Sequence, residues 1–315
     1  MKMHNIGYIL LRALLWIPAH LPLGFHHAVS RFICWMMRDV IHYRRDVVMT
    51  NLSRSFPDKK YWELTEIADR FYSHLADIIV EAIWYGGCTN PSRFVKNCPE
   101  EMVNPEVIQH LMEVSPAVMI LNSHCGNWEF FGSINYFDRP EGSPCPFTED
   151  NVVVVYKRPS SKVWDKFLKK NRLTTVKDPS FDGYVETSEF FRYALVNLAA
   201  GKKKLYNMNT DQAPYRNVDR LPVGEFMHQQ TDTMYGGVAV AHKKGMSVAY
   251  MNVSWVKRGR YRLTFTPICE DASTMEPLQI MKQMEQFTLM PSMDGAALMR
   301  TTKTTNLLLR LRRIR

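Results

Sequence analysis

The sequence predicts an α/β protein with a mostly parallel, mixed sheet flanked by helices and an N-terminal membrane-associated helical segment. Uncharged runs of strand length alternate with amphipathic stretches of helical period. Uncharged runs of this kind are typical of strands that are buried on both faces. The chain has 315 residues, 46% of them hydrophobic and 23% charged. It is therefore long enough to bury a large core, and its composition excludes wholesale disorder.

The N-terminal segment contains two apolar stretches, residues 6–25 and 29–37, before a basic run that begins at Arg38. The first stretch is interrupted by Arg12, Pro18, His20 and Pro22, whereas a clean membrane span needs about 20 apolar residues. A cleaved signal peptide, a buried soluble helix and a membrane anchor are the three interpretations. We expect a membrane anchor in residues 1–40, either as one short span or as an in-plane helical hairpin.

The remaining elements are predicted in chain order from periodicity. A long amphipathic helix follows Pro57, because apolar residues recur every three or four positions from Trp62 to Ile83. Asp58 can cap this helix, and Gly86 and Gly87 end it. Further helices are expected at residues 105–113, 161–171, 186–200, 233–244 and 274–289, and strands at residues 117–121, 151–156, 204–209, 247–256 and 260–266. We expect the catalytic domain to cover residues 41–290, followed by an atypical basic tail at 291–315.

Charge and motifs narrow the classes of function. The chain has 40 Lys and Arg against 31 Asp and Glu, a net charge of +9, which favours an anionic partner: nucleic acid, an acidic membrane surface or an acidic carrier. The basic residues form no nucleic-acid recognition motif. The six cysteines form no CxxC pair or Cys/His cluster, so we expect reduced thiols and no metal site. Dinucleotide-binding, P-loop and GxSxG patterns are missing from the sequence.

The strongest chemical signal follows the first expected buried strand, in the segment Asn122 to Glu129, which reads NSHCGNWE. His124 falls on the strand-to-helix turn, Gly126 permits a tight backbone, and Glu129 lies in the first helical turn. A carboxylate beside an imidazole fixes the ring tautomer, so that the other nitrogen takes a proton from a hydroxyl. His124 and Glu129 are therefore a candidate general-base dyad; a histidine that merely caps the turn is the alternative. Cys125 is not expected to be a nucleophile.

Four sequence blocks resemble the lipid A biosynthesis acyltransferases, the late lauroyl and myristoyl transferases of the wider HxxxxD/E glycerolipid acyltransferase group. Residues 123–129 resemble the H-x-G-N-W-E block of that family. Residues 43–45 and 51–57 resemble its arginine-rich N-L-x-x-x-F-P entry. Residues 156–159, YKRP, resemble its Y-R-P segment, and Asp211-Gln212 its D-Q block. The blocks occur in the order of the family.

The resemblance implies acyl transfer from an acyl carrier protein thioester to a hydroxyl of a lipid A precursor. His124 would be the base and Glu129 its partner, with Arg158 and Asp211 as further active-site residues. It implies no metal or cofactor, and the acyl thioester, on acyl carrier protein or coenzyme A, is a co-substrate. The expected partners are acyl carrier protein and an anionic lipid acceptor, at the bacterial inner membrane with the catalytic domain facing the cytoplasm.

The sequence also departs from the family pattern. An expanded segment that includes residues 178–184 separates Arg158 from Asp211, and we expect it to reshape the acyl or headgroup pocket. After Pro291 the family usually has tryptophans and a basic H-R-R-W-like cluster, whereas this chain has none after Trp255. We interpret residues 292–315 as an altered tail. A same-fold transferase for an aminolipid, lysophospholipid or glycolipid, and a non-catalytic lipid-binding homologue, are the alternative functions.

Overall fold

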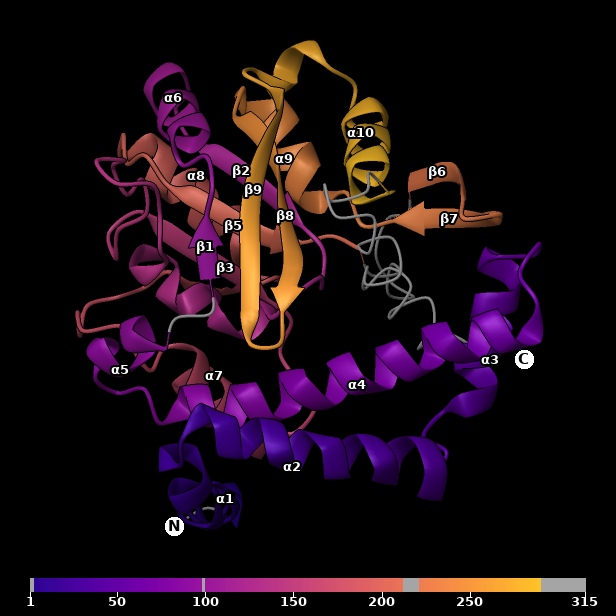
Figure 1. Cartoon of the computed structure of the whole chain (residues 1–315). Helices are drawn as coiled ribbons and strands as arrows, with labels where there is room; N and C mark the ends of the chain where they lie inside the picture. Colours follow the sequence, from indigo (N-terminus) through magenta and orange to yellow (C-terminus); the bar gives the residue numbers. More distant parts are fainter. Residues whose placement is uncertain (1–2, 98–99, 212–220, 290–315) are drawn as a thin grey trace.

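The computed structural model describes residues 3–97, 100–211 and 221–289. Figure 1 shows a central sheet with helices on both faces and a helical layer along the bottom. The elements are α1 (Met3–His20), α2 (Leu23–Trp35), a π-helix (Met36–Val40), α3 (Arg45–Ser55), α4 (Tyr61–Gly86), α5 (Pro91–Lys96), β1 (Glu100–Met102), α6 (Glu106–Val114), β2 (Val118–Asn122), a 3₁₀ segment (Trp128–Tyr136), β3 (Val152–Tyr156), α7 (Lys162–Arg172), β4 (Tyr184–Glu186), α8 (Phe190–Ala199), β5 (Leu205–Asn209), β6 (Leu221–Phe226), β7 (Gln229–Thr233), α9 (Gly236–Lys244), β8 (Ser247–Lys257), β9 (Arg260–Cys269), a short 3₁₀ turn (Ala272–Thr274) and α10 (Pro277–Leu289).

The main sheet has seven strands in the order β1-β9-β8-β2-β5-β3-β4. Its pairs are parallel except for the β8–β9 hairpin, which is antiparallel. The predicted mixed, mostly parallel α/β sheet is therefore confirmed. In its centre, β2 pairs with β5 so that Asn122 lies opposite Asn209. The carboxyl ends of β2 and β5 consequently lie side by side at one edge of the sheet.

Alternation along the strands divides the core between the two faces of the sheet. Val118 and Ile120 of β2 pack with α4, α5, α6 and the 3₁₀ segment, whereas Met119 and Leu121 pack with α8, α9 and α10. All five residues of β2 are buried. Because each strand residue serves one face or the other, a strand buried on both faces reads in the sequence as an uninterrupted apolar run.

The N-terminal segment forms two helices that lie beneath the sheet domain, with α2 running alongside α4 (Figure 1). Within the described residues, no single helix is long and apolar enough to cross a membrane. Residues 5–20 and 23–40 meet the length and composition criteria only as a pair, which is bent by 115°. Large apolar side chains of both helices are exposed, including Leu14 at 72% and Phe32 at 59%.

Several expected elements have different ends in the structure. The long helix starts at Tyr61, where the Glu63 carboxylate accepts from the Lys60 backbone N–H at 2.9 Å, so Asp58 is not its cap. The helix expected at 186–200 begins only at Phe190, because Glu186 belongs to β4, which pairs with β3. Likewise α9 and α10 start at Gly236 and Pro277. The predicted tail at 291–315 lies outside the described residues, and the division at residue 40 stays a prediction.

One buried carboxylate connects the N-terminal helices with the sheet. Glu81 of α4 is 1% exposed. Its Oε1 lies 3.0 Å from Nε2 of His27 on α2. Its Oε2 accepts from Nδ2 of Asn127 and from the hydroxyl of Tyr261 on β9, both at 2.8 Å. We call these four residues the Glu81 cluster; it holds the segment after β2 between a surface helix and the sheet.

A second buried contact joins the same layers. Asp77, one turn before Glu81 on α4, accepts from Ser30 of α2 at 2.5 Å and from Arg258 of the β8–β9 turn at 2.6 Å. Helix α2 is therefore attached to α4 and to the hairpin at two successive turns. These buried charges are acceptable in the interior because each has hydrogen-bonded partners.

Removing the Glu81 carboxylate is expected to destabilise the chain strongly. Glu81→Ala leaves the buried Asn127 and Tyr261 and the half-buried His27 without their shared acceptor, which costs about 3 kcal/mol in the free energy of unfolding. Glu66→Ala on the same helix, whose carboxylate is exposed, is the control and is expected to change it by less than about 0.5 kcal/mol. Chemical denaturation of the two variants measures the difference, and equal small losses would contradict the role of the cluster.

Candidate active site

The candidate site lies where three neighbouring parallel strands end. β2, β5 and β3 are adjacent in the sheet. His124 follows β2, Asp211 follows β5 and Lys157 follows β3. Loops at the carboxyl ends of parallel strands are the usual place for binding and chemistry in open α/β sheets. The arrangement brings together residues that lie up to 87 positions apart in the chain.

His124 is held by Asp211 at two points. Its Nδ1 lies 2.7 Å from Oδ1 of Asp211, and its backbone N–H donates to Oδ2 at 3.0 Å. The Asp211 side chain is fully buried, whereas that of His124 is 16% exposed. Because an ionised carboxylate only accepts hydrogen bonds, Nδ1 carries the proton. The remaining ring nitrogen, Nε2, then has the lone pair with which a histidine removes a proton.

The turn that carries His124 has little freedom. Gly126 has a positive φ of 62°, and a Cβ at this position would lie 2.2 Å from Cγ1 of Val253. Two residues later, the ring of Trp128 meets the ring of His124 edge-to-face, with centroids 4.8 Å apart. Asn127 accepts from the Glu129 backbone N–H at 3.2 Å and donates to Glu81. The His124 ring is thus held by the Asp211 carboxylate, by the ring of Trp128 and by the fixed backbone of the turn.

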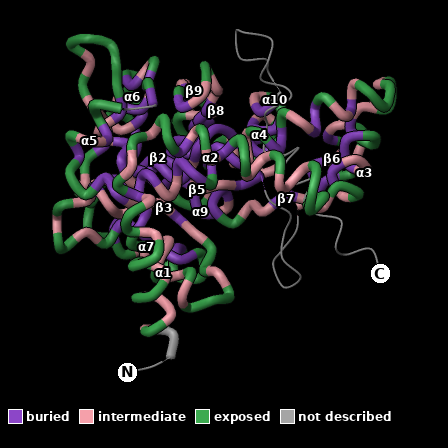
Figure 2. Tube along the Cα trace, turned by 60° about the horizontal axis from the view of Figure 1, so that its bottom comes forward, coloured by how far each residue is buried: buried purple, intermediate pink, exposed green. Residues whose placement is uncertain are grey.

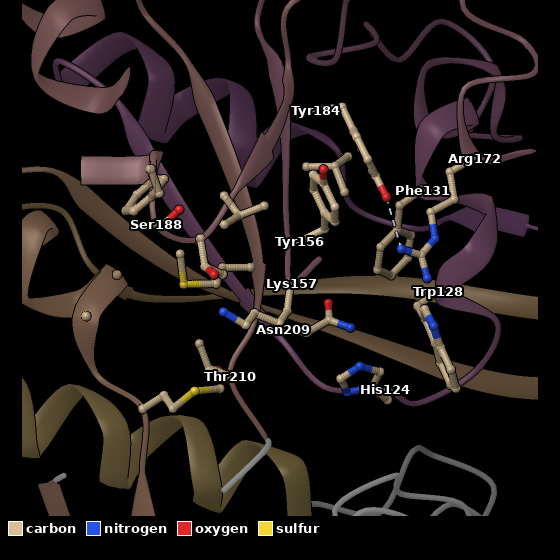
Figure 3. Close-up of a pocket in the computed structure, with 18 of the residues that line it drawn as sticks. His124, Trp128, Phe131, Tyr156, Lys157, Arg172, Tyr184, Ser188, Asn209 and Thr210 are labelled. Atoms are coloured by element: carbon tan, nitrogen blue, oxygen red, sulfur yellow. Dashed lines mark hydrogen bonds between the residues drawn. The ribbon is translucent and has the colours of Figure 1, made fainter. Parts of the chain in front are cut away.

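His124 lines a cavity of about 630 Å³, within the range of about 300–1,000 Å³ that small-molecule sites occupy. Its walls are largely apolar and include Phe131, Val155, Phe190 and Val240. Figure 3 shows His124, Trp128 and Arg172 on one side, with Ser188 and Thr210 opposite. An apolar cavity with a few polar groups near one reactive side chain suits a molecule with a hydrocarbon portion and a polar reacting group.

Glu129 contacts an arginine and not the imidazole. Nη2 and Nε of Arg172 donate to its two carboxylate oxygens at 2.6 and 2.8 Å. Burial raises the pKa of Glu129, but the Arg172 charge and hydrogen bonds outweigh it, and the net pKa is lowered. Arg172 also donates to the hydroxyl of Tyr184 at 3.1 Å. The hydrogen-bonded contact between Glu129 and His124 that the sequence suggested is replaced by the Asp211 contact, since Arg172 takes both carboxylate oxygens.

Arg158 does not join the other predicted residues. Its side chain is 62% exposed, and its Nε lies 3.8 Å from Asp165 of α7. Among the described residues that line the cavity, the cations are Lys157 and Arg172. The motif lies at the end of β3, where Lys157, and not Arg158, lines the cavity. Gln212, the second residue of the D-Q block, lies outside the described residues.

Arg172, Tyr184 and Lys157 were not identified from the sequence as site residues. Arg172 closes α7 four residues after the half-buried Leu168, so it lies on the inward face of the helix, while Lys169 and Lys170 are exposed. A charged residue at an inward-facing helix position was the sequence signal that could have identified Arg172. Tyr184 belongs to the expanded segment, and its ring stacks on Tyr156 with centroids 4.0 Å apart. The expected influence of this segment on the pocket agrees with the place of Tyr184 in the cavity wall.

Glu186, at the end of β4, fixes the segment that carries Lys157. Its carboxylate accepts from the backbone N–H of Ser188 at 2.7 Å and lies 3.6 Å from Nζ of Lys157. Burial raises the pKa of Glu186, but hydrogen bonds from Ser188, Arg158 and Thr187 outweigh it and lower the pKa to about 2. The carboxylate is therefore ionised at neutral pH.

The fold and the site together define an open α/β sheet with a carboxylate-held histidine beside an apolar cavity, an arrangement that is typical of enzymes. A sequence model of the family described as bacterial lipid A biosynthesis acyltransferase matches residues 2–136. The match covers less than half of the chain, and over these residues the chain is similar to a family whose description implies an acyltransferase enzyme. No curated protein matches the chain. The matched residues include His124 and Glu129 and end before Lys157, Arg172 and Asp211.

Acid is expected to remove the stabilisation that Glu186 provides. The folded-state pKa of about 2 lies below the ordinary value of 4.5, so this stabilisation is complete above 4.5 and is lost as the pH falls from 4.5 towards 2. Glu186→Gln should therefore be less stable than the wild type above pH 4.5, with the difference shrinking below it. The free energy of unfolding at several pH values measures this, with exposed Glu189→Gln as the control. A difference that is constant with pH would contradict the assignment.

Proposed function

We propose that this chain transfers a fatty acyl group from an acyl carrier protein thioester to a hydroxyl of a lipid A precursor, with His124 as the general base. The observation that carries the proposal is the His124–Asp211 contact at the wall of an apolar cavity. The family match supports the acyl chemistry and the class of acceptor. The carrier-protein donor and the individual roles of the residues belong to the proposal.

In the proposed reaction, Nε2 of His124 takes the proton of the acceptor hydroxyl as its oxygen attacks the thioester carbonyl carbon. The resulting tetrahedral intermediate collapses, the carbon–sulfur bond breaks, and the imidazolium returns the proton to the departing thiolate. Asp211 holds the ring and stabilises its positive charge while the proton is on it, as a carboxylate does for a catalytic histidine. An alcohol supplied by the acceptor makes a protein nucleophile unnecessary.

In this scheme Glu129 contributes to the site by binding Arg172 and not by a hydrogen bond to the His124 ring. Its ionised carboxylate fixes the guanidinium at the cavity wall, and the His124 charge further lowers the pKa of Glu129. The family pattern pairs the histidine with the glutamate as a dyad. In this chain His124 and Glu129 interact through charge, while the hydrogen bond to the ring comes from Asp211. The roles of Glu129 and Asp211 can be tested by separate substitutions.

The exposed apolar side chains of α1 and α2 provide a surface for the inner membrane. Ile9, Leu10, Leu14 and Ile17 of α1 and Phe25 of α2 are between half and three-quarters exposed. Apolar residues at this density in a short helical pair suit a membrane interface. With the sheet domain on the cytoplasmic side, an acyl carrier protein and a membrane-bound acceptor can both reach the site.

The function is tested with membranes that contain the chain, radiolabelled acyl carrier protein thioesters of several lengths, and three acceptors: lipid A precursor, an aminolipid and a lysophospholipid. We expect label in the lipid A precursor. Label in another lipid instead would show that the proposed acceptor is wrong. Equal labelling from coenzyme A thioesters would show that the donor need not be acyl carrier protein. If no acyl group is transferred to any acceptor, the proposed acyltransferase activity is wrong and a lipid-binding role is favoured.

The two carboxylates are distinguished by matched amide substitutions. His124→Ala and Asp211→Asn are each expected to lower kcat at least about 100-fold, since general-base catalysis and ring orientation are lost. Glu129→Gln should change the stability more than the acidic limb of the pH–rate profile. A shift of that limb in Glu129→Gln, with none in Asp211→Asn, would restore Glu129 as the direct partner of the base.

Lys157 and Arg158 offer a second matched pair. Lys157→Gln removes a charge from the cavity wall and is expected to raise the KM for a substrate several-fold. Arg158→Gln alters an exposed side chain and should stay within about twofold of the wild type in both kcat and KM, as surface changes usually do. Steady-state kinetics of the two variants measure this. A larger loss of activity in Arg158→Gln than in Lys157→Gln would show that Arg158 is the active-site residue, as the family resemblance implies.

A further inference from the structure

A second cavity, of about 380 Å³, lies between α1 and α7. Lys166, Lys169 and Lys170 of α7 line it, together with Tyr8 of α1. The expanded segment closes another side with Asp178, Pro179 and Phe181. Lys166 donates to the side-chain oxygen of Asn5, which ties the two helices together beside the opening. The hollow is therefore framed by three elements.

The three lysines have no acidic partner among the residues that the structure describes. In the part of the chain that the structure describes, no carboxylate lies within 4.0 Å of any of their ammonium groups. The carboxylate of Asp178 faces its own turn, where Oδ1 accepts from the backbone and hydroxyl of Ser180 at 2.8 and 2.7 Å. Three like charges around one hollow repel one another, and an anion with several oxygens relieves that repulsion.

The second cavity adjoins the cavity of His124. Leu173 lines both of them. Nζ of Lys169 lies 5.9 Å from the ring centroid of Tyr184, the residue whose hydroxyl accepts from Arg172 in the first cavity. Figure 3 shows Tyr184 and Arg172 at the same end of the first cavity, away from Thr210. A molecule long enough to pass Leu173 and Tyr184 can occupy both hollows.

The opening also lies beside the apolar surface of the N-terminal helices. α1 contributes Tyr8 to the cavity, while its neighbours Ile9 and Leu10 are exposed. Figure 2, which brings the bottom of the molecule forward, shows α1 next to α7 with exposed residues on both. An occupant with an anionic head and apolar chains finds the complementary surfaces together here.

We propose that the cavity between α1 and α7 binds the phosphate monoester of the membrane lipid acceptor while the hydroxyl of that lipid lies at His124. The inference rests on the proposed function for the identity of the acceptor. A phosphate monoester carries a charge of about −1.5 to −2 near neutral pH, which matches a trio of lysines better than the single charge of a diester. Lysine supplies compact point charges that bind phosphate without a fixed planar geometry.

Binding is measured on the full chain with short-chain phosphatidic acid, a monoester, and with short-chain phosphatidylglycerol, a diester, by phosphorus NMR and calorimetry. The variant is Lys166→Gln/Lys169→Gln/Lys170→Gln. The control is Lys202→Gln/Lys243→Gln/Lys244→Gln, which removes the same number of exposed charges elsewhere. We expect the wild type and the control to prefer the monoester, and the cavity variant to bind it at least about tenfold more weakly. Equal weakening in both variants, or no preference for the monoester, would overturn the site.

Kinetics separate this site from the proposed function. If acyl transfer occurs, the cavity variant should raise the KM for a phosphorylated acceptor at least about tenfold and leave the KM for the acyl donor unchanged. A rise in the KM for acyl carrier protein alone would overturn the lipid site in favour of carrier docking. Monoester binding that is lost in the cavity variant, in a chain that transfers no acyl group, would support the site and overturn the function instead.

Discussion

The buried carboxylate of Glu81 is the constraint on which the arrangement of layers depends. It lies beneath the turn that carries the base, and its two oxygens hold a surface helix through His27, the turn through Asn127 and the sheet through Tyr261. Three segments that are distant in the chain therefore share one acceptor. Asn127 extends the constraint, because its oxygen also accepts from the backbone N–H of Glu129 in the following 3₁₀ segment. Helix α2 is consequently connected by hydrogen bonds to the segment that directly follows His124.

Much of the fold was predictable because buried strands and amphipathic helices leave clear periods in the sequence. β2, β3, β5, β8 and β9, and helices α4, α6 and α7, lie close to their expected positions. β1 and β4 were not predicted, since three residues are too few for a period. Glu186 shows why the start of α8 was misplaced: its carboxylate accepts from the turn at Ser188, so the strand ends there and the helix begins later.

The candidate site was predictable in its location and less so in its contacts. His124 and Asp211 were identified, and the common edge of β2 and β5 brings them together. Which carboxylate contacts the ring depends on a competing partner, because Arg172 binds both oxygens of Glu129 from a helix that no local spacing connects to it. Lys157 and Arg158 are neighbours in the sequence and both side chains are exposed, yet Lys157 lines the cavity whereas Arg158 lies beside Asp165.

The distance of 87 residues between His124 and Asp211 also has a consequence for timing. Parallel strands require a long crossover, and here β3, α7, β4 and α8 all lie between the two strands that carry the pair. His124 is therefore synthesised, and β2 is available for pairing, well before Asp211 is added to the chain. A nascent or partly folded chain has no oriented imidazole, because contacts of high sequence separation form late. The oriented imidazole that the proposed reaction requires forms only when β5 has entered the sheet, so recovery of acyl transfer would report that step of assembly.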